Sequence, residues 1–242
     1  MTASVLLTPA DVVLAAPVEL VVLDMAGTTV RDDGIVERAF ARTAERTGVA
    51  AALSDDEALD YVRRTMGMSK LDVFRHLSGG DEDAAARAAE AFEQAYAELV
   101  GEEGAEAIEG AEQMLRDLRA AGLSVALTTG FAPATRDAIL DALGWYELVD
   151  VALSPIDAGR GRPAPDLVLT ALLRTGASSV QSVVVVGDTT SDVASGRRAG
   201  AGLVVGVLTG AHDRAALEAA APDLIVEDVT ALGSIRGLWA RS

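Results

Sequence analysis

The chain has 242 residues, of which 50% are hydrophobic and 4% aromatic, and its formal net charge is −17. This charge excludes nucleic acid and anionic membrane surfaces as expected partners, because both repel an acidic protein, and it favours a small substrate. The absence of cysteine excludes disulfides, a thiolate nucleophile and cysteine metal ligands, and a reducing cytoplasm is the simplest compartment for such a chain.

Residues 1–16 are predicted to form a loose N-terminal tail. They lack the basic stretch with which a secretory signal begins, and no apolar run in the chain approaches the ~20 residues needed to span a bilayer. We therefore expect a cytoplasmic protein that does not associate with a membrane.

The first predicted strand ends in a carboxylate. Val21, Val22 and Leu23 are typical of a parallel strand buried on both faces, and Asp24 follows them. Open α/β sheets place their chemistry just beyond the carboxyl ends of such strands, which makes Asp24 the candidate nucleophile. A strand closed by an Asx-type turn is the alternative, and this stretch alone does not separate the two interpretations.

Residues 33–107 are predicted to form an all-helical insertion. Four helices are expected there from their apolar periodicity and capping signals, at 37–47, from 54, from 69, and from 81 to about 100. The segment 101–104 is the expected hinge back.

From residue 108 onward, apolar strands alternate with helices. The further strands are expected at 123–127, 149–153, 183–186, 203–207 and 224–226. This βαβ rhythm predicts an α/β fold with a doubly wound, Rossmann-like parallel sheet. Its core would comprise residues 17–32 and 108–242, with the helical cap inserted between them.

Polar residues occur near three further strand ends. Thr128 and Thr129 offer hydroxyls and backbone amides that can hold a phosphate oxygen. Asp188 and Asp192 offer the hard oxygen ligands that Mg²⁺ prefers, and Arg162 supplies a cation for a phosphoryl group. Taken singly, the threonine and the arginine also fit a capping hydroxyl and a surface arginine, but the motifs together indicate one site.

In this order the motifs resemble those of the haloacid dehalogenase superfamily. They are Asp24 to Thr29, then Thr128, then Arg162, then Asp188 to Asp192. The resemblance covers about residues 18–242, and it implies that the helical insertion closes over the core and supplies specificity. A homodimer formed through the cap would match the family.

The resemblance also implies roles for these residues. Asp24 would attack phosphorus to give an aspartyl-phosphate. Mg²⁺ would be bound by Asp24, the Ala26 carbonyl and Asp188. Asp192 would support the metal site, directly or through water.

Ala26 departs from the common phosphatase pattern of this superfamily. Phosphatases carry a second aspartate at this position, which protonates the departing alkoxide and activates the hydrolytic water. A methyl group cannot donate a proton, and general acid catalysis of this type is typically worth ~10²–10⁴ in rate. Some other device must stabilise the leaving group.

Lys70 offers such a device. If Ser69 is the N-cap and Asp72 its N3 partner, then at about 100° per residue Lys70 lies in line with Phe74 on the apolar face of a cap helix. Desolvation and the helix dipole would favour the neutral amine, the form that attacks carbonyls. The alternative is a lysine whose charged end reaches solvent from the helix terminus.

Ala26 combined with Met66-Gly67-x-x-Lys70 resembles the phosphonatase branch, the family of phosphonoacetaldehyde hydrolases. In that family the cap lysine forms a Schiff base with the substrate aldehyde, so C–P cleavage releases an enamine and needs no acid at position 26. The resemblance makes Arg162 the phosphonate-binding cation. It also places Met66 at the substrate, although plain packing is its alternative.

Two positions depart from that branch. Its members usually have a histidine three residues after the lysine, where this chain has Val73, and a cysteine ten residues after the nucleophile, where it has Gly34. The two histidines of the chain, His76 and His212, are interpreted as surface residues rather than replacements.

The sequence thus predicts a Mg²⁺-dependent hydrolase that cleaves the C–P bond of phosphonoacetaldehyde or a similar carbonyl phosphonate. A phosphomonoester phosphatase of the same fold, with an atypical leaving-group mechanism, is the alternative enzyme. A non-catalytic protein that binds a phosphorylated ligand is the alternative outside enzymes. In each case the partner is a small phosphonate or phosphate.

Overall fold

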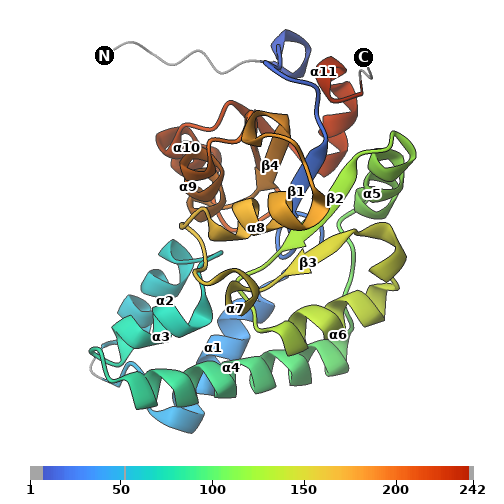
Figure 1. The fold of residues 1–242 in the computed structure, drawn as a ribbon. Helices are drawn as coiled ribbons and strands as arrows, with labels where there is room; N and C mark the ends of the chain where they lie inside the picture. The colour runs from blue at the N-terminus through green and yellow to red at the C-terminus, as the bar shows by residue number, and fades with distance from the viewer. Residues whose placement is uncertain (1–7, 52, 240–242) are drawn as a thin grey trace.

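The computed structural model describes residues 8–51 and 53–239. Its sheet has six strands, and neighbouring strands run parallel in the order β3-β2-β1-β4-β5-β6. Figure 1 labels β1 to β4 of this sheet. The strands are β1 (Leu20–Asp24), β2 (Ser124–Thr128), β3 (Val151–Leu153), β4 (Val183–Gly187), β5 (Leu203–Val207) and β6 (Leu224–Val226). The order reverses between β1 and β4, and ligands of such sheets bind at the carboxyl ends beside that point.

Helices cover both faces of the sheet. α8 and α9 lie on one face, and α5, η4 and α11 lie on the other (Figure 1). The α-helices of the core are α5 (Ala111–Ala120), α6 (Pro133–Leu143), α7 (Pro155–Ala158), α8 (Asp166–Thr175), α9 (Thr190–Ala199), α10 (Arg214–Ala220) and α11 (Arg236–Trp239). The 3-10 helices are η1 (Pro9–Asp11), η2 (Tyr146–Leu148), η3 (Val180–Ser182) and η4 (Val229–Ser234).

β1 forms because its apolar residues are buried on both faces. Leu20 and Val22 belong to the apolar cluster beneath α8, whereas Val21 and Leu23 belong to the cluster beneath α5. Each such side chain contributes about 1.5–3 kcal/mol when it is fully buried. The alternation holds β1 in the centre of the sheet and leaves Asp24 at its carboxyl end.

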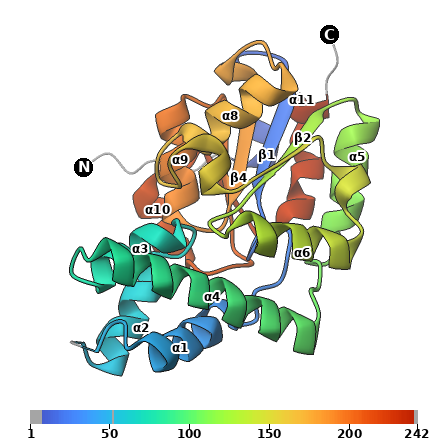
Figure 2. The same ribbon diagram turned by 60° about the horizontal axis from the view of Figure 1, so that its bottom comes forward.

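The four helices between β1 and α5 form the cap, which lies at one end of the core (Figures 1 and 2). They are α1 (Ile35–Thr47), α2 (Asp55–Arg64), α3 (Lys70–Leu77) and α4 (Glu82–Glu103). All four fall within the predicted range 33–107. The predicted α/β fold, a Rossmann-like parallel sheet with an inserted helical cap, is confirmed.

The predicted hinge at 101–104 is wrong in its extent, because α4 continues to Glu103 and ends at Gly104. The ion pair between Arg38 and Glu103, at 2.6 Å, and the one between Arg42 and Glu102, at 3.1 Å, hold the last turn of α4 against α1. The extra turn therefore comes from contacts between helices that the local sequence does not reveal.

The sheet differs from the predicted strands mainly at its β3 edge. The strands at 203–207 and 224–226 are confirmed, and β2 begins one residue later than predicted. β3 is shortened to three residues. Before it, the Asp150 N–H donates to the Val125 carbonyl at 2.8 Å, but the Val125 N–H donates to the Asp150 carboxylate at 2.8 Å in place of a backbone carbonyl.

Aromatic residues join the cap to the core. Phe92 and Tyr96 of α4 pack against Phe131, which follows β2, with ring centroids 6.3 Å and 4.4 Å from it. Phe74 of α3 lies 5.9 Å from Phe92. These side chains are nearly fully buried, so the apolar interior of the cap continues into the core.

Part of the predicted loose tail, 1–16, lies outside the described residues. Within the part that is described, η1 packs against η4, and the Val12 side chain is buried in the core cluster. Across the described residues, no helix is both long and apolar enough to cross a membrane.

Candidate active site

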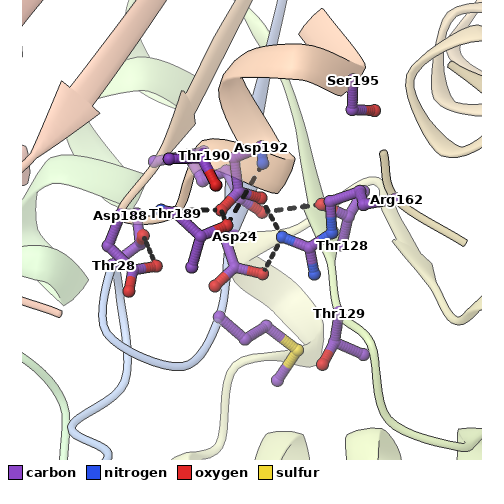
Figure 3. A network of polar contacts seen from close by, with 12 residues as sticks. Asp24, Thr28, Thr128, Thr129, Arg162, Asp188, Thr189, Thr190, Asp192 and Ser195 are labelled. Atoms are coloured by element: carbon purple, nitrogen blue, oxygen red, sulfur yellow. Dashed lines mark hydrogen bonds and ion pairs between the residues drawn. The ribbon is translucent and has the colours of Figure 1, made fainter. Parts of the chain in front are cut away.

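Three aspartates meet at the carboxyl ends of β1 and β4 (Figure 3). Asp24 ends β1, Asp188 follows β4, and Asp192 lies in the first turn of α9. One carboxylate oxygen of each lies within 4.8 Å of the other two, and none of the residues is more than 4% exposed. The predicted carboxylates therefore lie together in one buried cluster.

Asp188 is held in place by two donors. Thr28 Oγ1 donates to its Oδ1 at 3.1 Å, and the Ala211 N–H donates to its Oδ2 at 2.7 Å. Gly27 has a φ of +84°, and a Cβ atom there would lie 2.5 Å from Asp188 Oδ2. The small-residue turn after Asp24 is thus required by both the backbone conformation and the close approach of Asp188.

Asp192 lies between the end of a helix and a cation. It forms a capping box with Thr189, the N-cap of α9, whose N–H donates to Asp192 Oδ2 at 3.1 Å. Its Oδ1 accepts a hydrogen bond from Arg162. Asp192 therefore positions both α9 and Arg162, in addition to lying within the carboxylate cluster.

Arg162 lies between two of these carboxylates (Figure 3). Its Nη1 is 2.5 Å from Asp24 Oδ1 and also pairs with Asp192. Ser195 Oγ, on α9, donates to the Ala164 carbonyl at 2.8 Å and fixes the loop that carries Arg162. Burial by itself would lower the pKa of Arg162, but the two carboxylates raise it above its ordinary value, so the guanidinium remains charged.

Two donor atoms of Arg162 lack acceptors. Nε and Nη2 are buried and have no hydrogen-bond partner among the described residues. Buried donors without partners are costly, about 1–3 kcal/mol each. An anion with oxygen acceptors, such as a phosphoryl or phosphonyl group, would satisfy both donors.

Burial and mutual repulsion disfavour the ionised forms of these carboxyl groups. Burial raises the pKa of Asp24 well above its ordinary value, and Asp192 and Asp188 add to the shift while Arg162 opposes it. Burial, reinforced by Asp192, raises the pKa of Asp188 to about 7. A divalent cation would reverse this penalty.

The donor set fits Mg²⁺. It consists of hard carboxylate oxygens. Ala26 lines the same cavity as Asp24 and Asp188, and its carbonyl accepts no hydrogen bond from the described residues. Asp24, the Ala26 carbonyl and Asp188 are the residues that would hold the ion by the family resemblance, and this ligand set stays a prediction. Asp192 is close enough to contribute, but its oxygens already accept hydrogen bonds from Arg162 and Thr189.

A cavity of about 690 Å³ lies between this cluster and the cap. Thr129 lines it, whereas Thr128 is not among the lining residues. The Thr128 hydroxyl is directed to the Leu23 carbonyl at 3.5 Å, and Thr129 Oγ1 accepts the Phe131 N–H at 3.2 Å. Of the two predicted threonines, the structure therefore places Thr129 at the cavity.

Lys70, the only lysine in the chain, lines the same cavity from the cap. It is the first residue of α3 and is 8% exposed. Its Nζ lies 5.4 Å from the ring centroids of both Phe92 and Phe131, and it has no hydrogen bond or ion pair to the described residues. Burial lowers the pKa of Lys70, and the nearby carboxylates of Glu93 and Asp32 oppose that shift.

The predicted capping of α3 is wrong in one respect. Ser69 occupies the N-cap position, but its side chain makes no capping hydrogen bond, and Asp72 pairs with Arg75 instead. Ser69 packs against Gly161, where a Cβ atom would lie 2.8 Å from Ser69 Cβ. Packing against the core has replaced the local cap.

The segment of the cap before Lys70 approaches the core closely. Gly67 has a φ of +79°, and a Cβ atom there would lie 2.6 Å from Thr189 Oγ1. A Cβ atom on Gly130 would collide with the Met68 carbonyl. Met66 is buried and lines the cavity. The cap in this structure is therefore closed over the carboxylates.

The two histidines have different environments. His76 is exposed and stacks on Tyr61 at 4.5 Å, in agreement with the sequence interpretation. His212 differs from that interpretation, because it lines the cavity. Its Nδ1 accepts the Thr190 N–H at 2.9 Å, and its Nε2 lies 3.2 Å from the Arg63 carbonyl of the cap. The sequence carries no signal that a loop after β5 would meet α2.

Asp32 is a second cavity residue that sequence reasoning missed. It follows the nucleophile loop and precedes α1, where it is indistinguishable from an ordinary helix-capping aspartate. Only the closed position of the cap places it at the same cavity as Lys70.

The sheet, the buried carboxylates and the overlying cap define a capped α/β enzyme whose chemistry lies at the ends of β1 and β4. The family model for haloacid dehalogenase-like hydrolases matches residues 18–200. The chain belongs to this family of hydrolases.

Individual relatives refine the comparison. The chain is 29% identical over 220 residues to a phosphonoacetaldehyde hydrolase of Bacillus cereus, covering 81% of this chain and 78% of that protein. It is 31% identical over 214 residues to a phosphonoacetaldehyde hydrolase of Bordetella pertussis, covering 81% and 75%. Among solved structures, a hydrolase from Pseudomonas syringae aligns with a TM-score of 0.76 at 28% identity, covering 90% of this chain and 96% of that one.

Proposed function

We propose that the protein is a Mg²⁺-dependent hydrolase that cleaves the C–P bond of phosphonoacetaldehyde or a similar carbonyl phosphonate. The observation that carries the proposal is that one cavity contains both Ala26, beside the nucleophile, and the buried, unpaired amine of Lys70. A phosphomonoesterase would need an acid at residue 26, whereas an imine-forming enzyme needs the lysine. The names of the two relatives support the same reaction.

The substrate would be held at its phosphonate end by Arg162. The unpartnered Nε and Nη2 atoms would donate to phosphonate oxygens, and Thr129 lines the same part of the cavity. Mg²⁺, when bound to Asp24, the Ala26 carbonyl and Asp188, would reduce the repulsion between the carboxylate and the anionic phosphonate. Asp24 Oδ would then face phosphorus.

Lys70 would activate the carbon side. Its neutral amine adds to the aldehyde carbon, and loss of water gives an iminium ion. Asp24 then bonds to phosphorus while the electron pair of the C–P bond moves into the iminium ion, which becomes an enamine. One water hydrolyses the aspartyl-phosphate to phosphate, and another releases acetaldehyde from Lys70 after the enamine is protonated.

Trapping of the imine tests this proposal. With phosphonoacetaldehyde present, borohydride should reduce the imine to a stable secondary amine and inactivate the enzyme, with the added mass on the peptide that contains Lys70. The sequence has a single lysine, so added mass on a lysine side chain can only be at residue 70. Lys70→Arg should lose both trapping and turnover, because a guanidinium cannot act as the amine nucleophile.

The control is a panel of phosphomonoesters, which form no imine. If these are hydrolysed faster than phosphonoacetaldehyde, the C–P hydrolase proposal is wrong and the alternative, a phosphomonoester phosphatase of the same fold, holds. If Lys70→Arg keeps near-normal turnover, Lys70 is only an electrostatic or structural residue and the imine mechanism is wrong.

A further inference from the structure

Imine chemistry at Lys70 requires a partner that exchanges protons. The ammonium form must lose a proton before it attacks, and the hydroxyl of the carbinolamine must gain one before it leaves as water. Neither Val73 nor Gly34 carries a group that titrates, and Lys70 has no hydrogen bond to the described residues. The proton acceptor must therefore be another group that reaches the cavity.

Three carboxylates raise the pKa of Lys70 against the effect of burial, those of Glu93, Asp32 and Asp24, and the Arg162 cation opposes them. Glu93 lies on α4, its Oε1 accepts the Ala132 N–H at 2.9 Å, and its Oε2 is buried. Glu93 does not line the cavity, whereas Asp32 and Lys70 both do. Asp24 lines the cavity as well, but it is the proposed nucleophile and a proposed Mg²⁺ ligand. Of the other two carboxylates, only Asp32 lines the cavity beside Lys70.

Asp32 also has one free oxygen. Its Oδ1 accepts the Val36 N–H at 3.1 Å and caps α1, while Oδ2 has no hydrogen-bond partner among the described residues. Burial raises the pKa of Asp32. The hydrogen bond from the Val36 N–H opposes that effect, as do the charges of Lys70 and Arg38, while Glu37 adds to it. The carboxyl is therefore suited both to accept and to return a proton.

We propose that Asp32 is the acid–base residue of the Lys70 imine step, an inference that rests on the proposed function. The Asp32 carboxylate takes one proton from the Lys70 ammonium ion, and the resulting amine bonds to the aldehyde carbon. A second ammonium proton passes to the former carbonyl oxygen. Asp32 then returns its proton to that hydroxyl, which leaves as water, and the iminium ion and the carboxylate remain.

The alternative role, a purely electrostatic one, predicts the opposite change. If Asp32 acts only as a negative charge near Lys70, its removal lowers the pKa of Lys70 further and increases the fraction of neutral amine. Imine formation would then be unchanged or faster. If Asp32 exchanges protons, the same substitution slows imine formation.

The experiment measures the rate of cyanoborohydride trapping of phosphonoacetaldehyde on the full-length, Mg²⁺-loaded protein between pH 5 and 8. Asp32→Asn keeps an oxygen that can cap Val36, so the fold should be retained, which the melting temperature checks. We expect trapping to slow by ~10²–10⁴, the usual contribution of a general acid–base group. In the wild-type protein, protonation of Asp32 contributes to the fall in trapping rate at low pH. In Asp32→Asn the pH dependence of trapping should therefore differ from that of the wild-type protein.

Glu93→Gln is the matched control, because it removes a carboxylate that acts on Lys70 from outside the cavity and keeps an acceptor for the Ala132 N–H. It should trap at the wild-type rate or faster. Wild-type trapping by Asp32→Asn, or a loss confined to Glu93→Gln, would overturn this inference and leave the proposed function intact. Absence of trapping in the wild-type protein would overturn both.

Discussion

At the scale of single residues, Ala26 separates this site from that of a phosphomonoesterase. Ala26→Asp would restore an acid beside Asp24, but it would add a fourth carboxylate to a cluster of three that already lie within 4.8 Å of one another. We expect C–P cleavage to fall by about tenfold or more, and phosphomonoester hydrolysis to rise above the wild-type level. Both rates can be followed by phosphate release.

Ala26→Asn is the matched control, because it fills the same space without an ionisable proton. It should slow C–P cleavage by crowding and leave phosphomonoester hydrolysis unchanged. An equal rise in both variants would show that size, rather than acidity, controls the leaving group.

Several residues that sequence analysis identified lie at or next to the end of an element. Asp24 ends β1, Asp188 follows β4 and Lys70 begins α3, so local pattern was sufficient to select them. Asp32 and His212 line a cavity that is formed jointly by the cap and the core. Contacts between segments far apart in sequence leave no local periodicity, and no pattern could have indicated either residue.

At the scale of elements, the strands were predicted more closely than the helix ends. A buried parallel strand is a continuous apolar run, so its limits follow from burial alone. The end of α4 depends on ion pairs with α1, and the start of α3 depends on Ser69 packing against Gly161. Where tertiary contacts determine a helix end, the capping residues alone do not predict it.

The turn between α2 and α3 gives a prediction at this scale. Gly67→Ala would add a methyl group 2.6 Å from Thr189 Oγ1 at a φ of +79°. We expect the cap to shift away from the core and kcat/KM for phosphonoacetaldehyde to fall by ~10²-fold, because a misplacement of about 1 Å has that effect on a reacting pair. Steady-state kinetics would measure it.

Gly48→Ala controls for backbone strain. Gly48 ends α1 with a φ of +69°, and nothing lies within 4 Å of the added methyl group. This variant should lose about 1 kcal/mol of stability and keep its activity. If both variants lose activity equally, strain in the cap rather than its contact with Thr189 is responsible.

At the scale of the whole molecule, the buried carboxylates couple stability to pH and to metal. Burial raises the pKa of Asp188 to about 7, and that of Asp24 is raised as well. In the unfolded chain such a carboxyl has a pKa of about 4. When its pKa is higher in the folded protein, its contribution to stability is fully present below about pH 4 and is lost as the pH rises through the folded pKa. Without a divalent cation, stability should therefore decline between about pH 4 and 7.

Mg²⁺ should remove that decline, because it binds the ionised carboxylates of the folded protein. At a concentration 100-fold above its dissociation constant, a ligand that binds only the folded state stabilises it by about 2.7 kcal/mol, which for a chain of this size is a rise in melting temperature of about 5–10 °C. Calorimetry at pH 8 with Mg²⁺ or with EDTA would measure it.

Asp188→Asn removes one ligand and one buried charge, so the variant should melt at nearly the same temperature in both conditions. Equal melting temperatures for the wild-type protein would show that the carboxylate cluster does not bind the ion.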